Sequence, residues 1–146
     1  MSMRKNRTKA KLAANQCAIG AGIAFPSPDL VELCAVVGFD FVTLDTEHEP
    51  MGSEQVVHCI RAAEAYDITP IVRVARNPDV ILKFMNAGAQ GIHVPRCSSA
   101  DHLQELAGRP DVALVQNPSR RDHPPDAALL GGRIDDRLIG RVVQVH

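Results

Sequence analysis

The stretch that decides the fold is Gly38–Pro50, GFDFVTLDTEHEP, in which an apolar run passes directly into a cluster of polar side chains. Phe39–Leu44 is short and rich in Phe, Val and Leu, as buried parallel strands are. Asp45, Glu47 and His48 follow at the point where this strand would end. Active sites of parallel α/β folds lie at the carboxyl ends of their strands. The stretch therefore predicts a buried strand that leads into a functional loop, with a solvated turn as the structural alternative.

Three more apolar runs of strand length flank this one along the chain: Ala18–Ala24, Pro70–Val74 and Gly91–Val94. The segments between them have helical spacing of apolar residues. Their expected apolar faces are Leu30, Val31, Leu33, Cys34 and Val37; Val56, Val57, Ile60 and Ala63; and Val80, Ile81, Phe84 and Met85.

Start and stop signals support the three helices. Ser27 followed by Pro28 begins the first, and Ser53 is the expected cap of the second. Asn77 caps the third, and Gly88 ends it. A fourth, shorter helix is expected from about residue 99 to residue 106.

These elements give four βα units over residues 18–107. Strands joined by single crossover helices are parallel, with helices covering the sheet. Two architectures fit, a doubly wound sheet and part of a (β/α)8 barrel. Because a full barrel takes about 250 residues, four units make about half of one. The predicted division is a lead-in at 1–17, a partial barrel at 18–107 and an irregular tail at 108–146.

The tail differs in composition from the rest of the chain. Residues 108–146 contain no Lys, no Glu and no aromatic residue, and they are rich in Arg and Pro. Such a mixture is typical of a shifted reading frame in a GC-rich gene; a disordered or divergent tail is the alternative. Residues 138–145 are still compatible with a strand.

Bulk properties exclude several classes of function. The net charge is -1, so nothing global attracts nucleic acid or an acidic membrane surface. No apolar run approaches the roughly 20 residues of a membrane span, and no secretory signal is recognisable at the N-terminus. The basic residues near the N-terminus are interpreted as a solvated lead-in. The four cysteines form no close pair and are expected to be reduced and mostly buried, in a cytoplasmic protein.

Two side chains are the strongest candidates for chemistry. His48 carries an imidazole, whose ordinary pKa of about 6.5 suits a general base at neutral pH. Arg73 ends an otherwise apolar strand and therefore needs an anionic partner. Its planar fork matches a carboxylate or an enolate oxygen, with a structural salt bridge to Asp45 or Glu47 as the alternative. His93, within the fourth strand, is interpreted as a core histidine.

Three stretches together resemble the HpcH/HpaI aldolase family, of the 2-keto-3-deoxy sugar acid and 4-hydroxy-2-oxoheptanedioate aldolase type. They are Gly38–His48, Pro70–Arg73 and Asn86–Pro95, and the likeness extends over roughly residues 10–107. The strand end Asp-x-Glu-His and the run Ala-Gly-Ala-x-Gly-Ile-x-Val-Pro carry it jointly. The resemblance covers only the N-terminal half of such a protein.

The resemblance implies a (β/α)8 barrel that cleaves 4-hydroxy-2-oxo acids to pyruvate, or a related 2-oxo acid, plus an aldehyde. It implies a divalent metal (Mg²⁺, Mn²⁺ or Co²⁺) and no Schiff-base lysine, in trimers or hexamers. By the same likeness His48 would be the base, and Asp45, grouped with the catalytic residues, would occupy the acidic position beside it. Arg73 would bind substrate and steady the oxyanion. Glu47 and Asn86 would have supporting roles.

Three departures from the family pattern stand out. Asn86 replaces an Asp thought to raise the basicity of the catalytic His, and Gly22 stands where some relatives carry a large pocket side chain. No segment after Leu106 matches the Gln-x-Glu strand or the Gly-Pro-x-Asp loop that supply the family's metal ligands. The metal ligands are therefore expected outside this chain.

Three hypotheses of function remain. The first is a metal-dependent aldolase represented by its N-terminal half. The second is a catalytically inactive fragment that acts only as an oligomerising α/β module, since unpaired strand edges favour association. The third is a small flavodoxin-like binding domain, although Phe25–Pro28 occupies the place of its glycine-rich first turn.

Overall fold

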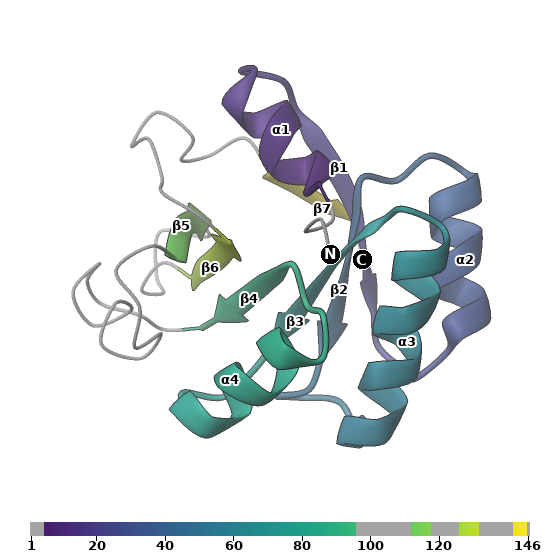
Figure 1. Cartoon of the computed structure of the whole chain (residues 1–146), viewed down its shortest axis with the longest axis vertical. Helices are drawn as coiled ribbons and strands as arrows, with labels where there is room; N and C mark the ends of the chain where they lie inside the picture. The colour runs from purple at the N-terminus through teal and green to yellow at the C-terminus, as the bar shows by residue number, and fades with distance from the viewer. Residues whose placement is uncertain (1–4, 96–111, 118–125, 132–141, 146) are drawn as a thin grey trace.

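The computed structural model describes residues 5–95, 112–117, 126–131 and 142–145 of the chain. Helices and strands alternate through the first of these ranges, and the other three are strands (Figure 1). In chain order the elements are α1 (Arg7–Ala13), β1 (Ala18–Ile23), α2 (Pro28–Val36), β2 (Phe41–Asp45), α3 (Ser53–Ala65), β3 (Thr69–Arg73), α4 (Pro78–Asn86), β4 (Gly91–Val94), β5 (Val112–Asn117), β6 (Asp126–Gly131) and β7 (Val142–Val145).

The strands form one sheet in the order β5-β6-β4-β3-β2-β1-β7. β1 to β4 are parallel neighbours in sequence order, and β7 lies parallel to β1 at one side. β6 pairs antiparallel with β4 at the other side. The four predicted strands are confirmed, Gly91–Val94 with unchanged bounds and the other three within two residues at each end.

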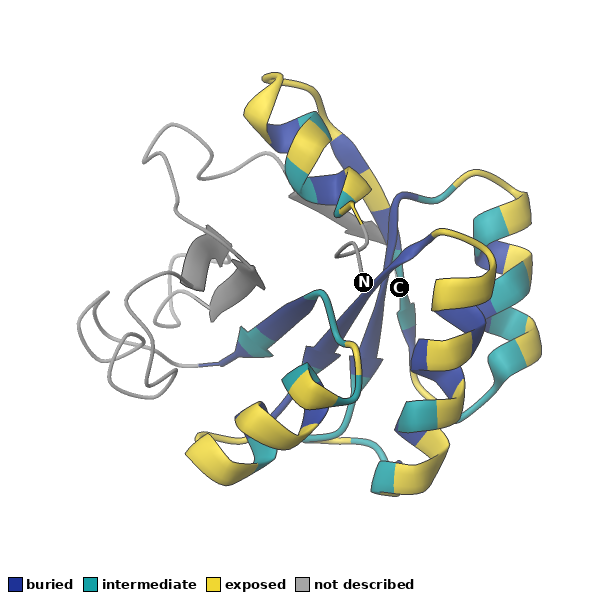
Figure 2. Cartoon of the chain, in the orientation of Figure 1, coloured by how far each residue is buried: buried dark blue, intermediate teal, exposed yellow. Residues whose placement is uncertain are grey.

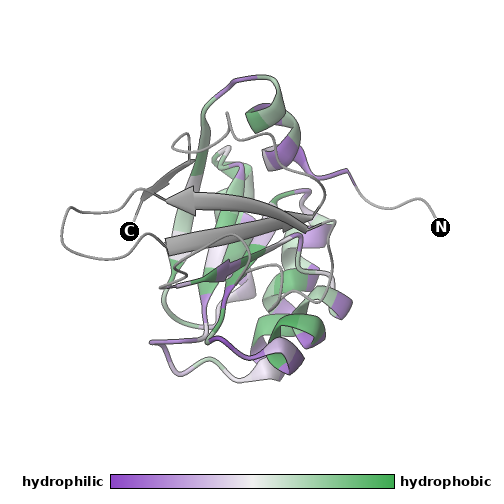
Figure 3. Ribbon diagram, turned by 90° about the vertical axis from the view of Figure 1, so that its left-hand side faces the viewer, coloured by the Kyte–Doolittle hydropathy of each residue, from purple (hydrophilic) through white to green (hydrophobic). Residues whose placement is uncertain are grey.

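Helices α2, α3 and α4 cover the same face of the sheet. Their buried residues form one core cluster with alternate residues of the strands, including Val42 and Leu44 of β2 and Val72 of β3. The centre of the sheet is buried while the outer sides of the helices are exposed (Figure 2), and hydrophobic residues run along the strands (Figure 3). A doubly wound sheet would have helices on both faces. Helices on one face are the arrangement of a barrel, so the chain forms part of a (β/α)8 barrel.

The helix signals in the sequence act as predicted at two of three starts. The side chain of Ser27 accepts a hydrogen bond from the backbone N–H of Leu30, and that of Asn77 accepts one from Asp79. For α3 the cap is Gly52, one residue before the predicted Ser53. Gly88 ends α4 with φ of 106°, a left-handed conformation that favours glycine.

The predicted apolar face of α2 is wrong in part. Val31 and Cys34 are buried as expected, but Leu33 and Val37 are 55% and 62% exposed. Val36, with 71% exposure, lies with them on the outer side of the helix. A helix turns about 100° per residue, so only one side of this almost entirely apolar helix can face the sheet.

Helix α1 lies across the edge where the strands begin, and no pattern in the sequence predicts it. Thr8 and Leu12 are fully buried, and the Thr8 hydroxyl donates to the backbone carbonyl of Asp40 at 3.0 Å. Lys11 Nζ lies 2.6 Å from Asp40 Oδ1. In Figure 1 the arrowheads of β2 and β3 point away from α1. The helix thus closes the amino-terminal edge of the sheet.

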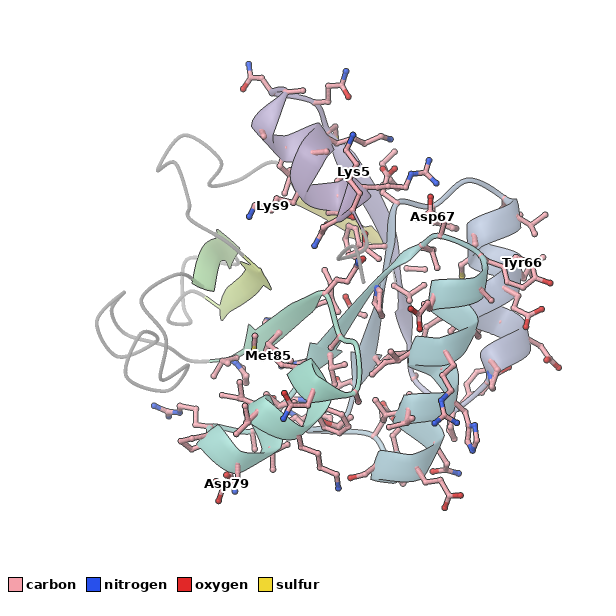
Figure 4. The ribbon with its side chains drawn as sticks, in the orientation of Figure 1. Lys5, Lys9, Tyr66, Asp67, Asp79 and Met85 are labelled. Carbon is pink, nitrogen blue, oxygen red and sulfur yellow. The ribbon has the colours of Figure 1, made fainter. Side chains whose placement is uncertain are left out.

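Side chains around α1 make further, exposed contacts. Arg7 Nη1 lies 3.5 Å from Asp67 Oδ2, on the turn after α3 (Figure 4). Tyr66, the residue before Asp67, points to α2. A hydrogen bond between Tyr66 and Glu32 raises the pKa of the phenol. Such exposed pairs contribute little to stability, so α1 is held chiefly by its buried contacts.

Some predictions fall outside the described ranges or go untested. The fourth helix, expected at residues 99–106, lies outside them, as does Cys97. Cys34 and Cys59 are buried, as predicted, and burial raises the pKa of each thiol, whereas Cys17 is exposed. The strand compatible with residues 138–145 is present as β7, while β5 and β6 were not predicted. The division at residues 17 and 107 stays a prediction. None of the helices in the described ranges is long and apolar enough to cross a bilayer.

Candidate active site

Asp45, the last residue of β2, organises the loop that follows it. Its Oδ1 accepts hydrogen bonds from the backbone N–H groups of Glu47 at 2.9 Å and His48 at 3.1 Å. An aspartate that binds the backbone two and three residues ahead is a common device for tight turns. The carboxylate therefore fixes where the loop places the Glu47 and His48 side chains.

Arg73, the last residue of β3, lies directly beside Asp45 in the sheet register. Its Nη1 donates to Asp45 Oδ2 at 3.1 Å, and its Nε lies 3.3 Å from Glu47 Oε2. These are the ion pairs expected if Arg73 forms a structural salt bridge with Asp45 or Glu47. The guanidinium is thus held by two carboxylates from the neighbouring strand end.

His48 lies close to the same two carboxylates. Its Nδ1 lies 3.5 Å from Asp45 Oδ2 and 3.6 Å from Glu47 Oε2. The structure therefore brings together all four of the candidate residues predicted around the second and third strand ends. An imidazole and a guanidinium share one pair of carboxylates at the carboxyl edge of the sheet.

Thr46 holds the two strand ends together, a role that its place in the sequence does not predict. Its backbone N–H and its hydroxyl both donate to the carbonyl of Arg73, at 3.0 Å and 2.6 Å. Only the register of β2 against β3 reveals this contact, because nothing in the local sequence distinguishes Thr46 from another loop residue. Thr46 fixes the spacing between the strand that carries His48 and the one that carries Arg73.

Burial is graded across the cluster. The side chains of Glu47, Asp45 and Arg73 are 13%, 20% and 23% exposed, whereas that of His48 is 53% exposed. Burial alone would raise the pKa of Asp45, but the backbone hydrogen bonds from His48 and Glu47 and the charge of Arg73 outweigh it and lower that pKa below its usual value. Asp45 is therefore an ionised anchor, and His48 is the most exposed member of the cluster.

Other predicted residues lie elsewhere. Asn86 is exposed at the last turn of α4. Because α4 runs back from the end of β3 to the start of β4, Asn86 lies at the opposite edge of the sheet from His48. Within this chain the structure does not bring the two together. Arg76 is exposed, and His93 is half-buried on β4 beside Arg73 in the register.

The described residues do not provide a metal site. They contain no group of three or more His, Cys, Asp or Glu side chains placed to hold an ion. Asp45 uses Oδ1 on two backbone N–H groups and Oδ2 on Arg73, and Glu47 faces the same guanidinium. The two carboxylates therefore neutralise a guanidinium, and they are not arranged as a ligand set for a metal ion.

The fold and this site define a class: a β/α barrel protein with acid–base groups at the carboxyl ends of its strands. The model of the HpcH/HpaI aldolase/citrate lyase family matches residues 23–110. The chain belongs to that family, and its aldolase relatives are carbon–carbon lyases. Two of the three stretches that carry the resemblance, Gly38–His48 and Pro70–Arg73, supply the residues of this site.

Individual relatives agree with this assignment. A hydroxypyruvate/pyruvate aldolase of Sagittula stellata is 39% identical over 119 residues, which cover 81% of this chain and 45% of that protein. A 4-hydroxy-2-oxovalerate aldolase of Novosphingobium aromaticivorans is 33% identical over 69% of this chain and 39% of that protein. The chain thus spans less than half the length of these relatives.

Solved structures show the same fold. The citrate synthase SbnG superposes with a TM-score of 0.65 and 37% identity, covering 70% of this chain and 42% of that one. An HpcH/HpaI aldolase from Desulfitobacterium hafniense gives a TM-score of 0.65 at 24% identity, over 70% of this chain and 40% of that one.

Proposed function

We propose that this chain carries the acid–base part of a metal-dependent (class II) aldolase that cleaves 4-hydroxy-2-oxo acids, such as 2-keto-3-deoxy sugar acids, to pyruvate and an aldehyde. The supporting observation is that His48 and Arg73 share the carboxylates of Asp45 and Glu47. The family and the names of the relatives agree with it. The partner is a small 2-oxo acid in the cytoplasm, with no role for nucleic acid or membrane.

The proposed chemistry divides between the two basic groups. His48 takes the proton of the substrate 4-hydroxyl, and the bond between C3 and C4 breaks to release the aldehyde. The electron pair of that bond moves into the enolate of pyruvate, whose oxygen carries the new negative charge. Arg73 stabilises this oxygen, and His48 returns its proton to C3 to give pyruvate. Asp45 is a positioning residue, because it holds both the loop of His48 and the guanidinium of Arg73.

A divalent metal belongs to this proposal through the family likeness alone. Such an ion would supply Lewis-acid chemistry to the bound 2-oxo acid. The described residues offer no ligand set for it, so its site is assigned to none of them. The supporting role of Asn86 also rests on the family likeness alone, because Asn86 does not contact His48 in this chain.

The alternative is a catalytically inactive aldolase fragment that acts as an oligomerising α/β module. The exposed apolar side of α2, formed by Leu33, Val36 and Val37, favours this second candidate. Self-association would remove these side chains from water. Under this alternative the cluster of His48 and Arg73 has no catalytic role.

Exchange of the pyruvate methyl protons distinguishes the two candidates. The purified chain is incubated with pyruvate in D2O and Mg²⁺ or Mn²⁺, and deuterium uptake is followed by mass spectrometry. The aldolase proposal expects uptake above the protein-free rate, and its loss in His48→Gln but not in His58→Gln, an exposed histidine of α3. Uptake no faster than in metal and buffer alone refutes an active chain and leaves the inactive module.

We also propose that residues 108–146 are read in a frame shifted from that of the family. The match to the family model ends at residue 110, close to the change in composition. The DNA downstream of codon 107 tests this. A one-base shift is expected to reveal a Gln-x-Glu strand and a Gly-Pro-x-Asp loop, and the idea fails if neither of the other two frames encodes them.

A further inference from the structure

His93 occupies the third place in a row of polar residues that crosses the candidate site. Asp45 of β2 pairs with Arg73 of β3, and Arg73 pairs with His93 of β4 in the parallel register. Paired residues of neighbouring strands lie about 5 Å apart. The row therefore continues from the ion pair directly to the imidazole of His93.

The side chains of this row lie on the face of the sheet away from the helices. Ile92 and Val94, on either side of His93, belong to the core under the helices, as do Val72 and Val74 on either side of Arg73. Successive side chains of a strand point to opposite faces. His93 and Arg73 therefore share the inner face, and His93 is half-buried there. A hydrogen bond of 3.0 Å from Val74 N–H to the His93 carbonyl fixes the register at this point.

Charge is distributed unevenly on the two sides of Arg73. On the β2 side stand the carboxylates of Asp45 and Glu47, at 3.1 Å and 3.3 Å from the guanidinium nitrogens. On the β4 side the segment Gly91–Pro95, GIHVP, contains no acidic residue. An anion drawn to Arg73 is repelled from the first side and meets a hydrogen-bonding imidazole on the second.

We propose that the bound 2-oxo acid lies with its carboxylate on the β4 side of Arg73, and that His93 is a positioning residue that donates a hydrogen bond to it. This inference rests on the proposed function and adds the orientation of the ligand. The reacting end of the acid then points to the β2 side, where the half-exposed His48 stands. The core-histidine interpretation of His93 is replaced by a ligand-positioning one.

The test compares two replacements of His93 with two ligands. His93→Leu removes the donor with little change of volume, and His93→Gln keeps an N–H donor. Dissociation constants of the full chain for pyruvate and for methyl pyruvate, which lacks the carboxylate charge, are measured by ligand-detected NMR. Loss of a hydrogen bond to a charged group predicts about tenfold weaker pyruvate binding in His93→Leu and about twofold or less in His93→Gln. Methyl pyruvate binding is expected to stay the same in all three proteins.

The outcomes separate this inference from the proposed function. If His93→Leu binds pyruvate as the parent does, or loses both ligands equally, His93 does not position the carboxylate, while the aldolase proposal stands. If the parent chain binds no pyruvate, both are overturned. Unchanged thermal unfolding of His93→Gln, together with an unchanged ring-proton resonance of His48, shows that the fold and the neighbouring site are intact in the comparison.

Discussion

Asp40 and Asp45 stand at opposite ends of β2, and each carboxylate faces a basic side chain. Asp40 is 5% exposed; it accepts from the backbone N–H of Ile19 at 2.9 Å and pairs with Lys11 of α1. Asp45 is 20% exposed and pairs with Arg73 and with His48, which is half exposed. Similar ion pairs thus stand at both ends of β2. The amino-terminal end, which α1 covers, is called the covered edge of the sheet, and the carboxyl end, where His48 is half exposed, the open edge.

The difference arises from what lies over each edge of the sheet. Helix α1 covers the amino-terminal edge, where Thr8 and Leu12 are fully buried and the Thr8 hydroxyl donates to the Asp40 carbonyl. At the carboxyl edge the cover is the loop of Glu47 and His48, which Asp45 itself holds. In barrel folds the first edge serves stability and the second serves chemistry. The two ion pairs are therefore expected to respond differently to substitution.

The largest expected effect is on stability, at the covered edge. Leu12→Ala removes a fully buried side chain of α1 and should lower the free energy of unfolding by about 2–5 kcal/mol. Leu82→Ala, on a side chain of α4 that is 53% exposed, should change it by about 0.5 kcal/mol or less. Urea denaturation followed by circular dichroism measures both. Equal, small losses would contradict the inference that α1 is held by its buried contacts at this edge.

The next effect is on ligand binding, at the open edge. Arg73→Met keeps the length of the side chain but removes the guanidinium, and should weaken pyruvate binding by a factor of about 10–100. Arg76→Met, on the exposed loop three residues further along, should leave the affinity within about twofold. Titration by ligand-detected NMR measures both. Equal affinities in the two variants would make the Arg73 cluster a purely structural ion pair.

The sequence predicted the covered and the open edge unequally well. Short apolar runs and the Ser27 and Asn77 caps depend on local chemistry, so four strands and two helix starts follow from them. Helix α1 does not, because only Thr8 and Leu12 of its residues are buried and its other side chains are mostly basic. Its formation depends on a sheet edge that no local pattern encodes.

The candidate site shows the same limit. That His48 and Arg73 meet follows from the rule that parallel strands end at one edge. That Asp45 holds both of them, and that His93 extends the row, requires the register of three strands. Likeness to a motif gives Asn86 a supporting role in the site, yet α4 ends at the opposite edge. Position in a motif does not reveal which edge of the sheet a residue occupies.

A smaller loss of stability is expected from Asp40→Asn, which removes the charge that faces Lys11 and keeps the shape of the side chain. Because Lys11 is 40% exposed, solvent screens the pair, and the loss should be about 1 kcal/mol. The matched control is Asp67→Asn, whose pair with Arg7 is more than half exposed and should contribute almost nothing. Chemical denaturation of the two variants compares them, and a loss in Asp67→Asn as large as in Asp40→Asn would contradict the assignment of a covered edge.

The smallest effect is a pH dependence at the open edge. The fold lowers the pKa of Asp45, because backbone hydrogen bonds and Arg73 outweigh the opposing effect of burial. A carboxyl group with a lowered pKa in the folded state adds stability above its unfolded pKa of about 3.9, and that contribution is lost as the pH falls through the folded pKa. The stability difference between the parent chain and Asp45→Asn should therefore shrink as the pH is lowered from about 6 to about 3. All other carboxylates are common to both proteins, so their contributions largely cancel in this difference.

Denaturation of the two proteins at a series of pH values measures the stability difference. A difference that stays constant or widens below about pH 4 would mean that Asp45 is not the ionised anchor that holds His48 and Arg73 together.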